Sequence, residues 1–585
     1  MPDAESPRVA YFSMEIALDA GIPTYSGGLG MLAGDTLRSA ADLAVPMVAV
    51  TLLYRRGYFH QRLDARGQQT EEPTVWRVED RLEPLRARAS VEIAGRTVHL
   101  GVWRYTIQGA GGAALPVYLL DADRPENDPD DRALTAELYG GDARHRLAQE
   151  IILGIGGVRM LRALGHEGLG TFHMNEGHAA LIAVALLDEM EASGGGEAAT
   201  ASATLKAELL AALRERCVFT THTPVPAGHD RFPADLVERL LTPAWKARLA
   251  MCGQVDGLNM TQLAIAVSRF VNGVALKHGE VSRAMFPGVD VRSITNGVHA
   301  ATWASPPFQR LFDKWAPGWR LDNAALRNII GAHGDEVWTA HLEAKQSLVE
   351  FLGERGHAGF DRDALTLVWA RRATGYKRPQ LIFESLERLK SMTRYIGPLQ
   401  IIFAGKAHPR DEEGKGLIRS IHEVAGQLRG KVPVAYIENY DMAVAQKLVA
   451  GADVWVNTPR PPMEASGTSG MKAAMNGVPS LSVLDGWWIE GHIEGATGWA
   501  VGEYVADDEN PENDRKVAHA LYEKLAKVVL PCYFKDREEF IAIMRRTVAF
   551  SGSFFNTHRM VEEYLVNAYR LQGGWRPRSE PAKPE

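Results

Sequence analysis

The chain has 585 residues, 46% of them hydrophobic and 23% charged, with a formal net charge of −7 at pH 7. This length exceeds the size at which single hydrophobic cores stop growing, so we expect two large domains. The net negative charge argues against a large basic surface for nucleic acid or anionic membrane. The sequence contains no run of about eighteen apolar residues, so no membrane span is predicted.

Cysteine usage and the two ends of the chain bear on its compartment. Cys217, Cys252 and Cys532 are far apart and lack the spacing of a metal or redox motif, which is typical of reduced thiols. Residues 1–5 are polar and are soon followed by a strand-like run, so we expect no signal peptide and a cytoplasmic location. Residues 576–585 contain three prolines and no large apolar side chain, and predict a disordered tail.

The N-terminal part predicts a βαβ unit. Residues 9–15 read as a strand, residues 21–30 as a glycine loop, residues 31–43 as a helix and residues 45–54 as a second strand. The loop carries the run S-G-G-L-G, which includes Gly28. Open parallel sheets bind ligands after a strand of this kind, although tight turns use such glycines equally often.

The next segments leave the main sheet and then return to it. Residues 87–120 include an alternating apolar and polar run, which predicts an antiparallel excursion. Residues 143–164 predict a long helix, residues 170–173 a strand, and residues 193–203 a Gly/Ala/Ser surface loop.

Polar residues follow the strand at residues 170–173 in the run H-M-N-E-G-H. His173 and His178 lie five apart across a strand-to-helix turn, so they do not share a helix face and a zinc site is not expected. Glu176 and His178 instead lie where a parallel strand ends, and a sugar hydroxyl would suit them.

A second strand is predicted at residues 217–221 and is followed by His222. His222 thus also lies at the carboxyl end of a parallel strand, where such sheets bind ligands. A buried histidine that is merely hydrogen-bonded in the core is the alternative interpretation. The run T-N-G-V-H, which contains Asn296, ends a further strand and completes the first half.

A second alternation of strands and helices begins near residue 364. A buried strand leads into a loop with Arg371, Arg372, Lys377 and Arg378, and residues 379–390 predict a helix. Four cations so close together repel one another, so we expect anions nearby. A solvated basic face is the alternative, but it would show helical spacing, whereas these residues flank a strand end where phosphate fits.

The segment at residues 464–485 centres on Lys472. A buried strand at residues 454–457 enters it, and a Gly/Ser/Thr loop is expected to open a helix near Ser466. The free N–H groups of that helix would form an anion site, and a partly desolvated lysine there could have a lowered pKa and form a Schiff base. A simple phosphate-binding or structural loop is the alternative.

The run E-A-S-G-T-S-G-M-K, followed by L-S-V-L-D-G, resembles the pyridoxal-phosphate segment of the α-glucan phosphorylases, in their bacterial short form. By this resemblance Lys472 carries pyridoxal phosphate as an imine, and Thr468 lies by the cofactor phosphate. The same resemblance implies that the sugar subsite is lined by Glu464, Ser466 and Gly467.

The resemblance extends over most of the chain. It implies that Arg371 or Lys377 holds the cofactor phosphate, that Arg372 binds inorganic phosphate, and that His222 holds the sugar through its backbone carbonyl. The remaining implied contacts are Gly28 at the phosphates, Trp303 and Tyr440 at the cofactor, and Glu176, His178 and Asn296 at the substrate. Asp441 departs from the family pattern, because larger members carry an arginine there.

The implied fold is α/β, with two Rossmann-like doubly wound lobes facing a cleft in the glycosyltransferase-B manner, at residues 1–300 and 301–585. The implied activity is phosphorolysis of an α-1,4-glucan or maltooligosaccharide with inorganic phosphate, giving α-D-glucose 1-phosphate with retention, without a metal and without allosteric control. A homo-oligomer is left open. A nucleotide-sugar-dependent glucan synthase of the same fold and a non-catalytic glucan-binding protein are the alternatives.

Overall fold

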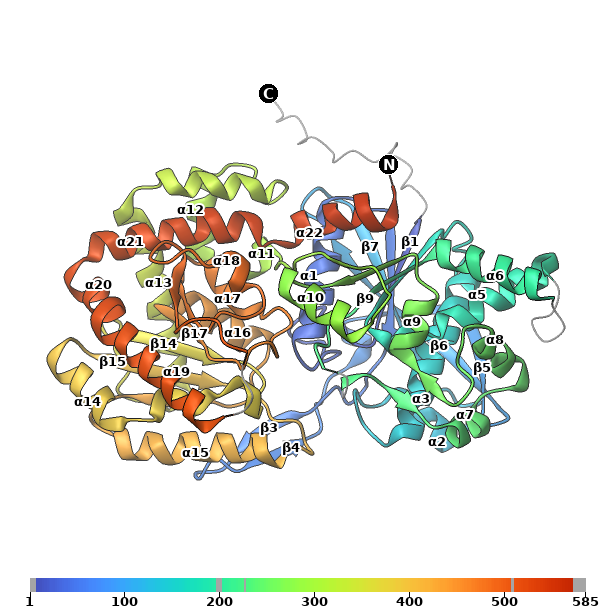
Figure 1. The fold of residues 1–585 in the computed structure, drawn as a ribbon, viewed down its shortest axis with the longest axis horizontal. Coiled ribbons are helices and arrows are strands. Elements are labelled where there is room, and N and C mark those ends of the chain that lie inside the picture. Colours follow the sequence, from blue (N-terminus) through green and yellow to red (C-terminus); the bar gives the residue numbers. More distant parts are fainter. Residues whose placement is uncertain (1–6, 196–201, 226–227, 507–509, 572–585) are drawn as a thin grey trace.

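The computed structural model describes residues 7–195, 202–225, 228–506 and 510–571. Two α/β lobes lie side by side, the first coloured blue to green and the second yellow to orange (Figure 1). The predicted tail at residues 576–585 and most of the predicted loop at residues 193–203 lie outside the described residues.

The first lobe is built on a nine-stranded sheet in the order β13-β12-β9-β8-β1-β2-β7-β6-β5. Its central strands pair in parallel, with Val9 opposite both Met47 and Thr171. They are buried along their whole length, as expected for strands covered on both faces. The strands are β1 (Val9–Ser13), β2 (Met47–Leu52), β5 (Glu83–Ile93), β6 (Arg96–Gln108), β7 (Ala114–Asp121), β8 (Thr171–Asn175), β9 (Cys217–Thr220), β12 (Phe270–Gly273) and β13 (Val291–Ser293).

The predicted antiparallel excursion is confirmed, since β6 pairs antiparallel with both β5 and β7. The helix predicted at residues 143–164 is also present, with a π-helical turn at Ile152–Gly156 between α3 and α4. The helices of this lobe are α1 (Gly28–Asp42), α2 (Pro129–Arg132), α3 (Ala143–Ile151), α4 (Gly157–Ala163), α5 (Ile182–Met190), α6 (Ala203–Arg216), α7 (Ala234–Leu240), α8 (Pro243–Met251), α9 (Met260–Ala266) and α10 (Leu276–Met285).

The second lobe holds a six-stranded parallel sheet in the order β16-β15-β14-β17-β18-β19. Its strands are β14 (Leu365–Ala370), β15 (Leu399–Ala404), β16 (Val434–Ile437), β17 (Val454–Asn457), β18 (Ser480–Ser482) and β19 (Gly498–Ala500). The prediction of two doubly wound lobes is confirmed, whereas the boundary at residue 300 stays a prediction. The chain order reverses between β1 and β8 in one sheet and between β14 and β17 in the other, and ligands bind outside such switch points.

The helix predicted at residues 379–390 is divided: a 3-10 turn at Pro379–Phe383 precedes α14, whose first turn is capped by the Ser385 side chain. The helices after residue 300 are α11 (Ala300–Trp303), α12 (Pro306–Trp315), α13 (Gly334–Glu354), α14 (Leu386–Tyr395), α15 (Glu412–Leu428), α16 (Met442–Gly451), α17 (Ser469–Ala474), α18 (Trp488–Gly491), α19 (Pro511–Lys524), α20 (Leu530–Lys535), α21 (Arg537–Arg546) and α22 (Thr557–Glu563). No helix among the described residues is long and apolar enough to span a bilayer.

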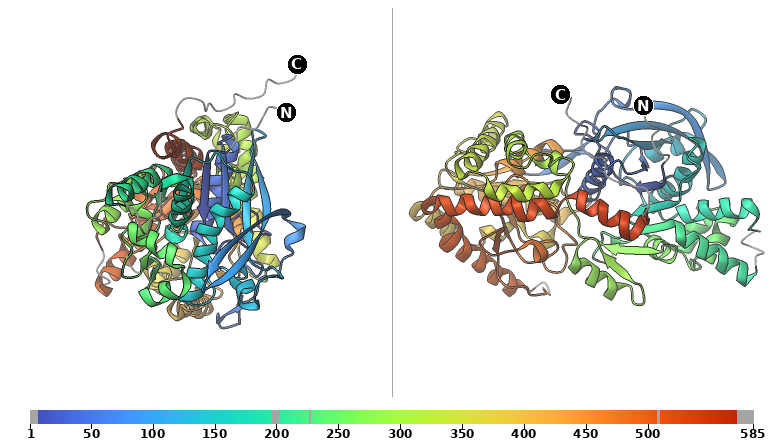
Figure 2. Two further views of the ribbon diagram at one scale, coloured as in Figure 1. Left: turned by 90° about the vertical axis from the view of Figure 1, so that its right-hand side faces the viewer. Right: turned by 90° about the horizontal axis from the view of Figure 1, so that it is seen from above.

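Two connections join the lobes besides the chain between them. Helices α21 and α22 run along one side of both lobes (Figures 1 and 2), and Met560 and Tyr564 pack into the apolar core of the first lobe. On the opposite side the hairpin of β3 (His60–Leu63) and β4 (Gln69–Glu72) leaves the first lobe and lies beside α15 of the second. The two lobes are therefore connected on two opposite sides.

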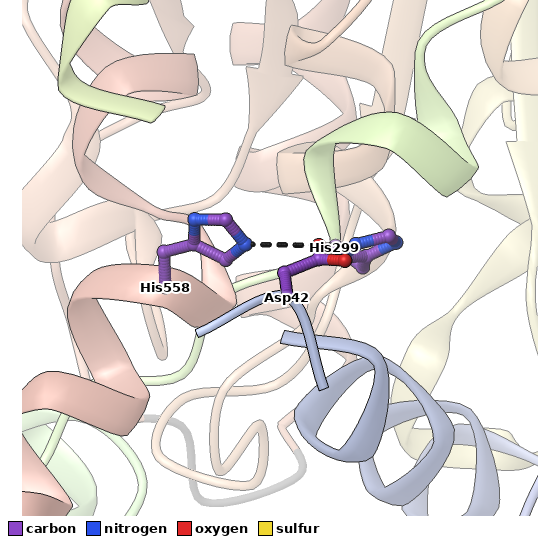
Figure 3. Close-up of side chains that lie close together, drawn as sticks. All are labelled: Asp42, His299 and His558. Atoms are coloured by element: carbon purple, nitrogen blue, oxygen red, sulfur yellow. Dashed lines mark hydrogen bonds and ion pairs between the residues drawn. The ribbon is translucent and has the colours of Figure 1, made fainter. Parts of the chain in front are cut away.

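The helical connection is fastened by a buried polar cluster (Figure 3). Asp42 ends α1, His299 precedes α11, and His558 belongs to α22. The Nε2 atoms of His299 and His558 lie 2.7 and 3.1 Å from the same oxygen of Asp42. Burial opposes ionisation of Asp42, but these hydrogen bonds outweigh it and hold the pKa of the carboxyl below its usual range. The cluster links the first lobe, the crossover and the C-terminal helix.

Candidate active site

A buried ion cluster lies at the switch point of the second sheet. Arg371 follows β14 and places Nη1 2.9 Å from Glu464, while Lys377 Nζ lies 2.9 and 3.1 Å from the two carboxylate oxygens of Glu464. Arg371 also donates to Ser469 Oγ at 3.1 Å and to Asn457 at the end of β17. Burial would raise the pKa of Glu464, but the two cations outweigh it and lower it. The structure therefore brings Arg371, Lys377 and Glu464 together where β14 and β17 end.

Arg372 and Arg378 behave differently from the other two cations. Arg372 is exposed, and within the described part of the chain no hydrogen bond or ion pair engages its guanidinium. Arg378 is instead buried, donating to the Thr458 carbonyl at 2.9 Å and to Asp514 at 2.8 Å. The anion that we expected near Arg378 is therefore the Asp514 carboxylate of the same lobe, and the backbone of Arg378 is left-handed (φ 46°).

The glycine loop of the first lobe lies against Arg372 of the second lobe. A Cβ atom built on Gly27 would lie 3.4 Å from Nη2 of Arg372, and one on Gly28 would meet nothing within 4 Å. The Tyr25 hydroxyl accepts a hydrogen bond of 2.9 Å from the backbone N–H of Met442 in the other lobe. Backbone N–H groups at the start of α1 and the Arg372 guanidinium thus border the same space, which suits an anion.

Lys472 is buried in α17, with Nζ 4.1 Å from the centre of the Trp303 ring. Burial lowers the pKa of this amine to about 8, against a smaller opposing effect of Asp35. The Trp303 indole donates to Asp35 Oδ2 at 2.7 Å, which fixes the ring. The predicted lowering of the Lys472 pKa is supported, and the amine loses its proton at a lower pH than an ordinary lysine does.

The helix that carries Lys472 begins later than predicted. It starts at Ser469 rather than near Ser466, because Gly467 has φ +84° and a left-handed residue cannot continue a helix turn. Lys472 therefore lies in the last turn of a short helix. Ser466 and Gly467 form the loop before it, and no described residue hydrogen-bonds the buried Ser466 hydroxyl. Thr468 precedes the helix and its carbonyl accepts from the Lys472 N–H at 3.1 Å.

A further acidic residue that the sequence reasoning missed shapes this loop. Asp485 accepts hydrogen bonds of 2.9 Å from the backbone N–H groups of Glu464 and Gly486. Burial raises its pKa to about 7, with Glu464 adding to the effect. The only sequence signal is its place immediately after the strand-like run that follows Lys472.

In the first lobe, Glu176 and His222 form one network at the ends of β8 and β9. Glu176 accepts from the His222 N–H at 2.8 Å and from the Thr223 hydroxyl at 3.0 Å. The His222 ring donates to Asn175 at 2.7 Å, and burial lowers its pKa to about 3. His222 is thus neutral and held in place by hydrogen bonds. This is compatible with a histidine that is only hydrogen-bonded in the core and with one that contacts a ligand.

His178 lies behind that network, its Nε2 3.6 Å from Asp230 and its Nδ1 buried without a partner. Burial lowers the pKa of His178 to about 3. Asn296 follows β13, and its side-chain oxygen is likewise buried without a partner. Both side chains keep hydrogen-bonding capacity that a hydroxyl-rich ligand could use.

Glu15 was also missed, although it lies two residues after the end of β1, much as Glu176 directly follows β8. Its carboxylate accepts from the N–H groups of Ser26 at 2.6 Å and Gly27 at 3.2 Å, and from the Tyr139 hydroxyl at 2.8 Å. Glu15 therefore fixes the glycine loop. An acidic residue at a strand end beside a glycine loop was the available signal.

Tyr440 and Asp441 follow β16 on the other flank of the ion cluster. Burial raises the pKa of Tyr440, while nearby Arg371 opposes the shift. Asp441 accepts from the Val444 N–H at 2.9 Å and caps α16. Asp441, which departs from the family pattern, therefore has a structural role as the N-cap of α16.

Two groups of described side chains have the composition of a metal site: Asp42 with His299 and His558, and Glu150 with His178 and Asp230. In the first, both imidazoles already bond one carboxylate oxygen. In the second, Arg146 lies 3.0 Å from Asp230 and 3.2 Å from Glu150, and a cation there disfavours a metal ion.

Comparisons with known proteins agree with this geometry. Residues 230–498 match the family model described as carbohydrate phosphorylase. The chain is 38% identical to a maltodextrin phosphorylase of Thermococcus litoralis, covering 97% of this chain and 71% of that protein. It is 38% identical to a glycogen phosphorylase of Mycobacterium tuberculosis (96% and 70% covered) and 33% identical to one of Aquifex aeolicus (97% and 87%).

Proposed function

The chain belongs to the carbohydrate phosphorylase family, and on this basis we propose that it cleaves α-1,4-glucans or maltooligosaccharides with inorganic phosphate. The product is α-D-glucose 1-phosphate, released from the non-reducing end with retention of configuration. One observation carries the proposal: the unpaired Arg372 faces the glycine loop of the opposite lobe, beside an ion cluster and the buried amine of Lys472.

Pyridoxal phosphate fits the residues around Lys472. The amine is buried, has a lowered pKa and lies over Trp303, so it could hold an aldehyde-bearing aromatic group against the indole. Thr468, Tyr440 and Arg371 would hold the phosphate end of the group. When bound, this cofactor supplies a phosphate that can exchange a proton with inorganic phosphate, and no amine substrate is required.

The protein's own residues then bind and orient the reactants. Arg372 would hold inorganic phosphate by a bidentate pair of charge-assisted hydrogen bonds, opposite the N–H groups of the glycine loop. Glu464, kept ionised by Arg371 and Lys377, would accept hydrogen bonds from the sugar hydroxyls. The backbone carbonyl of His222 would stabilise positive charge as it develops on the glucosyl unit, since preorganised dipoles act most strongly where charge develops.

On the glucan side, the buried polar atoms of Glu176, His178 and Asn296 would bind sugar hydroxyls. Ser466 and Gly467 would line the same subsite, because the Ser466 hydroxyl is buried without a protein partner. The three cysteines are unpaired, which supports a reducing cytoplasmic setting.

The test compares two donor reactions in the purified protein. Phosphate and maltooligosaccharide should yield glucose 1-phosphate, whereas a nucleotide sugar should yield no glucan elongation. Lys472→Ala should abolish both cofactor absorbance and phosphorolysis. Elongation from a nucleotide sugar by wild-type protein, or full phosphorolysis by Lys472→Ala, would refute the assignment.

A further inference from the structure

Two glutamines of the β3–β4 hairpin are buried in the opposite lobe, Gln61 fully and Gln69 with 2% of its surface exposed. The hairpin starts in the first lobe and lies beside α15 of the second (Figure 1). We propose that Gln61 and Gln69 are positioning residues: they hold Asn439 and residues 405–407 of the second lobe, and the segment that carries Arg371 and Arg372 packs against residues 405–407. This inference rests on the proposed function, and adds to it a role for the first lobe in building the anion site.

The two amides bond to two separate loops. Gln61 exchanges a pair of hydrogen bonds with Asn439, its N–H donating at 3.1 Å and its Oε1 accepting at 2.9 Å. Its Nε2 donates to the Gly405 carbonyl and to Gln69 Oε1 at 2.9 and 2.8 Å. Gln69 Oε1 accepts from the N–H of Ala407 at 3.0 Å, and its Nε2 donates to the carbonyl of the same residue at 2.9 Å.

Each of those loops leads directly to the candidate site. The Arg371 N–H donates to the Ala404 carbonyl at 3.0 Å, and the Ala373 N–H donates to the Lys406 carbonyl at 3.1 Å. A Cβ atom on Gly405 would lie only 2.0 Å from the Arg371 carbonyl, so the two segments are in close backbone contact. A shift of residues 405–407 must therefore displace residues 371–373. Asn439 immediately precedes Tyr440 on the other flank.

Two other contacts of the hairpin are of a different kind. Arg62 pairs with Glu438 at 3.3 Å and Gln68 accepts from Arg419 at 2.6 Å, both at partly exposed positions. Such contacts can hold the hairpin on the lobe without specifying the loop geometry. Buried amides are costly unless every polar atom is satisfied, so the Gln61–Gln69 pair defines one arrangement of loops 405–407 and 439.

The experiment compares Gln61→Met with Gln68→Met, two nearly isosteric changes at glutamines of one hairpin. The readouts are the KM for phosphate, the calorimetric Kd of inorganic phosphate on the cofactor-loaded protein, and the calorimetric Kd of maltooligosaccharide without phosphate. Gln61→Met should raise the KM and the Kd for phosphate about tenfold, because the segment that carries the arginines is displaced. The Kd for maltooligosaccharide should change by less than about twofold. Gln68→Met should match the wild type in all three.

Asn439→Gly provides a second test if Gln61→Met does not fold, since it removes one hydrogen bond and suits the left-handed backbone (φ 56°). It should weaken phosphate binding in the same direction. Equal phosphate constants for the Gln61 and Gln68 variants, or a loss confined to glucan binding, would overturn the inference. Absence of phosphorolysis in the wild type would refute the proposed function instead, and the phosphate Kd would still test Gln61.

Discussion

Replacement of Arg372 by lysine tests the assignment of the phosphate site. Arg372 is exposed toward the cleft and no described residue bonds its guanidinium, so the change breaks no internal contact and should leave the fold stable. A lysine keeps the charge but cannot reproduce the planar fork that binds two phosphate oxygens. It should lose about one charge-assisted hydrogen bond, worth about 1.5–3 kcal/mol. The KM for phosphate should therefore rise about 10- to 150-fold.

The assay measures initial rates of glucose 1-phosphate formation over a range of phosphate at saturating maltooligosaccharide. Arg394→Lys, an exposed arginine of α14 in the same lobe, is the matched control and should show wild-type kinetics. Maltooligosaccharide binding should be unchanged in both variants. A wild-type phosphate KM in Arg372→Lys would refute the placement of phosphate at this guanidinium.

Three further predictions concern the surroundings of the site. The rate at which pyridoxal phosphate attaches to cofactor-free protein should rise about tenfold per pH unit and level off above about pH 8, because only the neutral Lys472 amine reacts; a flat absorbance-monitored profile would contradict this. Gly486→Ala should weaken maltooligosaccharide binding measured by calorimetry, since the residue has φ +54° and its Cβ would lie 2.5 Å from the Ser466 carbonyl; unchanged affinity would argue against that loop as the sugar subsite. Lys345→Met should lower the unfolding free energy by about 3–5 kcal/mol, because it leaves the fully buried Asp453, now 2.5 Å from Lys345 Nζ, without its cation; a denaturation midpoint equal to the wild type would refute this.

The sequence by itself determined the elements and the chemistry they carry. The alternation of apolar residues in strands and the glycines at turns are local features of the sequence. The βαβ units and the antiparallel excursion could therefore be predicted from the sequence. Parallel sheets bind ligands at strand ends, and this rule pointed to Glu176, His222 and Arg371 before any pairing was known. The run around Lys472 identified a lysine whose pKa should be lowered, and burial in the folded lobe is the cause.

Tertiary structure alone decided which of these residues face the same space. Four adjacent cations look alike in sequence, but Arg378 pairs with Asp514, whereas Arg372 lies against Gly27 and no described residue bonds its guanidinium. The start of α17 depended on the left-handed backbone of Gly467, which a sequence run does not reveal. The bond from Gln61 to Asn439 joins residues 378 positions apart. Such contacts arise only after both lobes have folded and docked, because no local pattern encodes the distance between them.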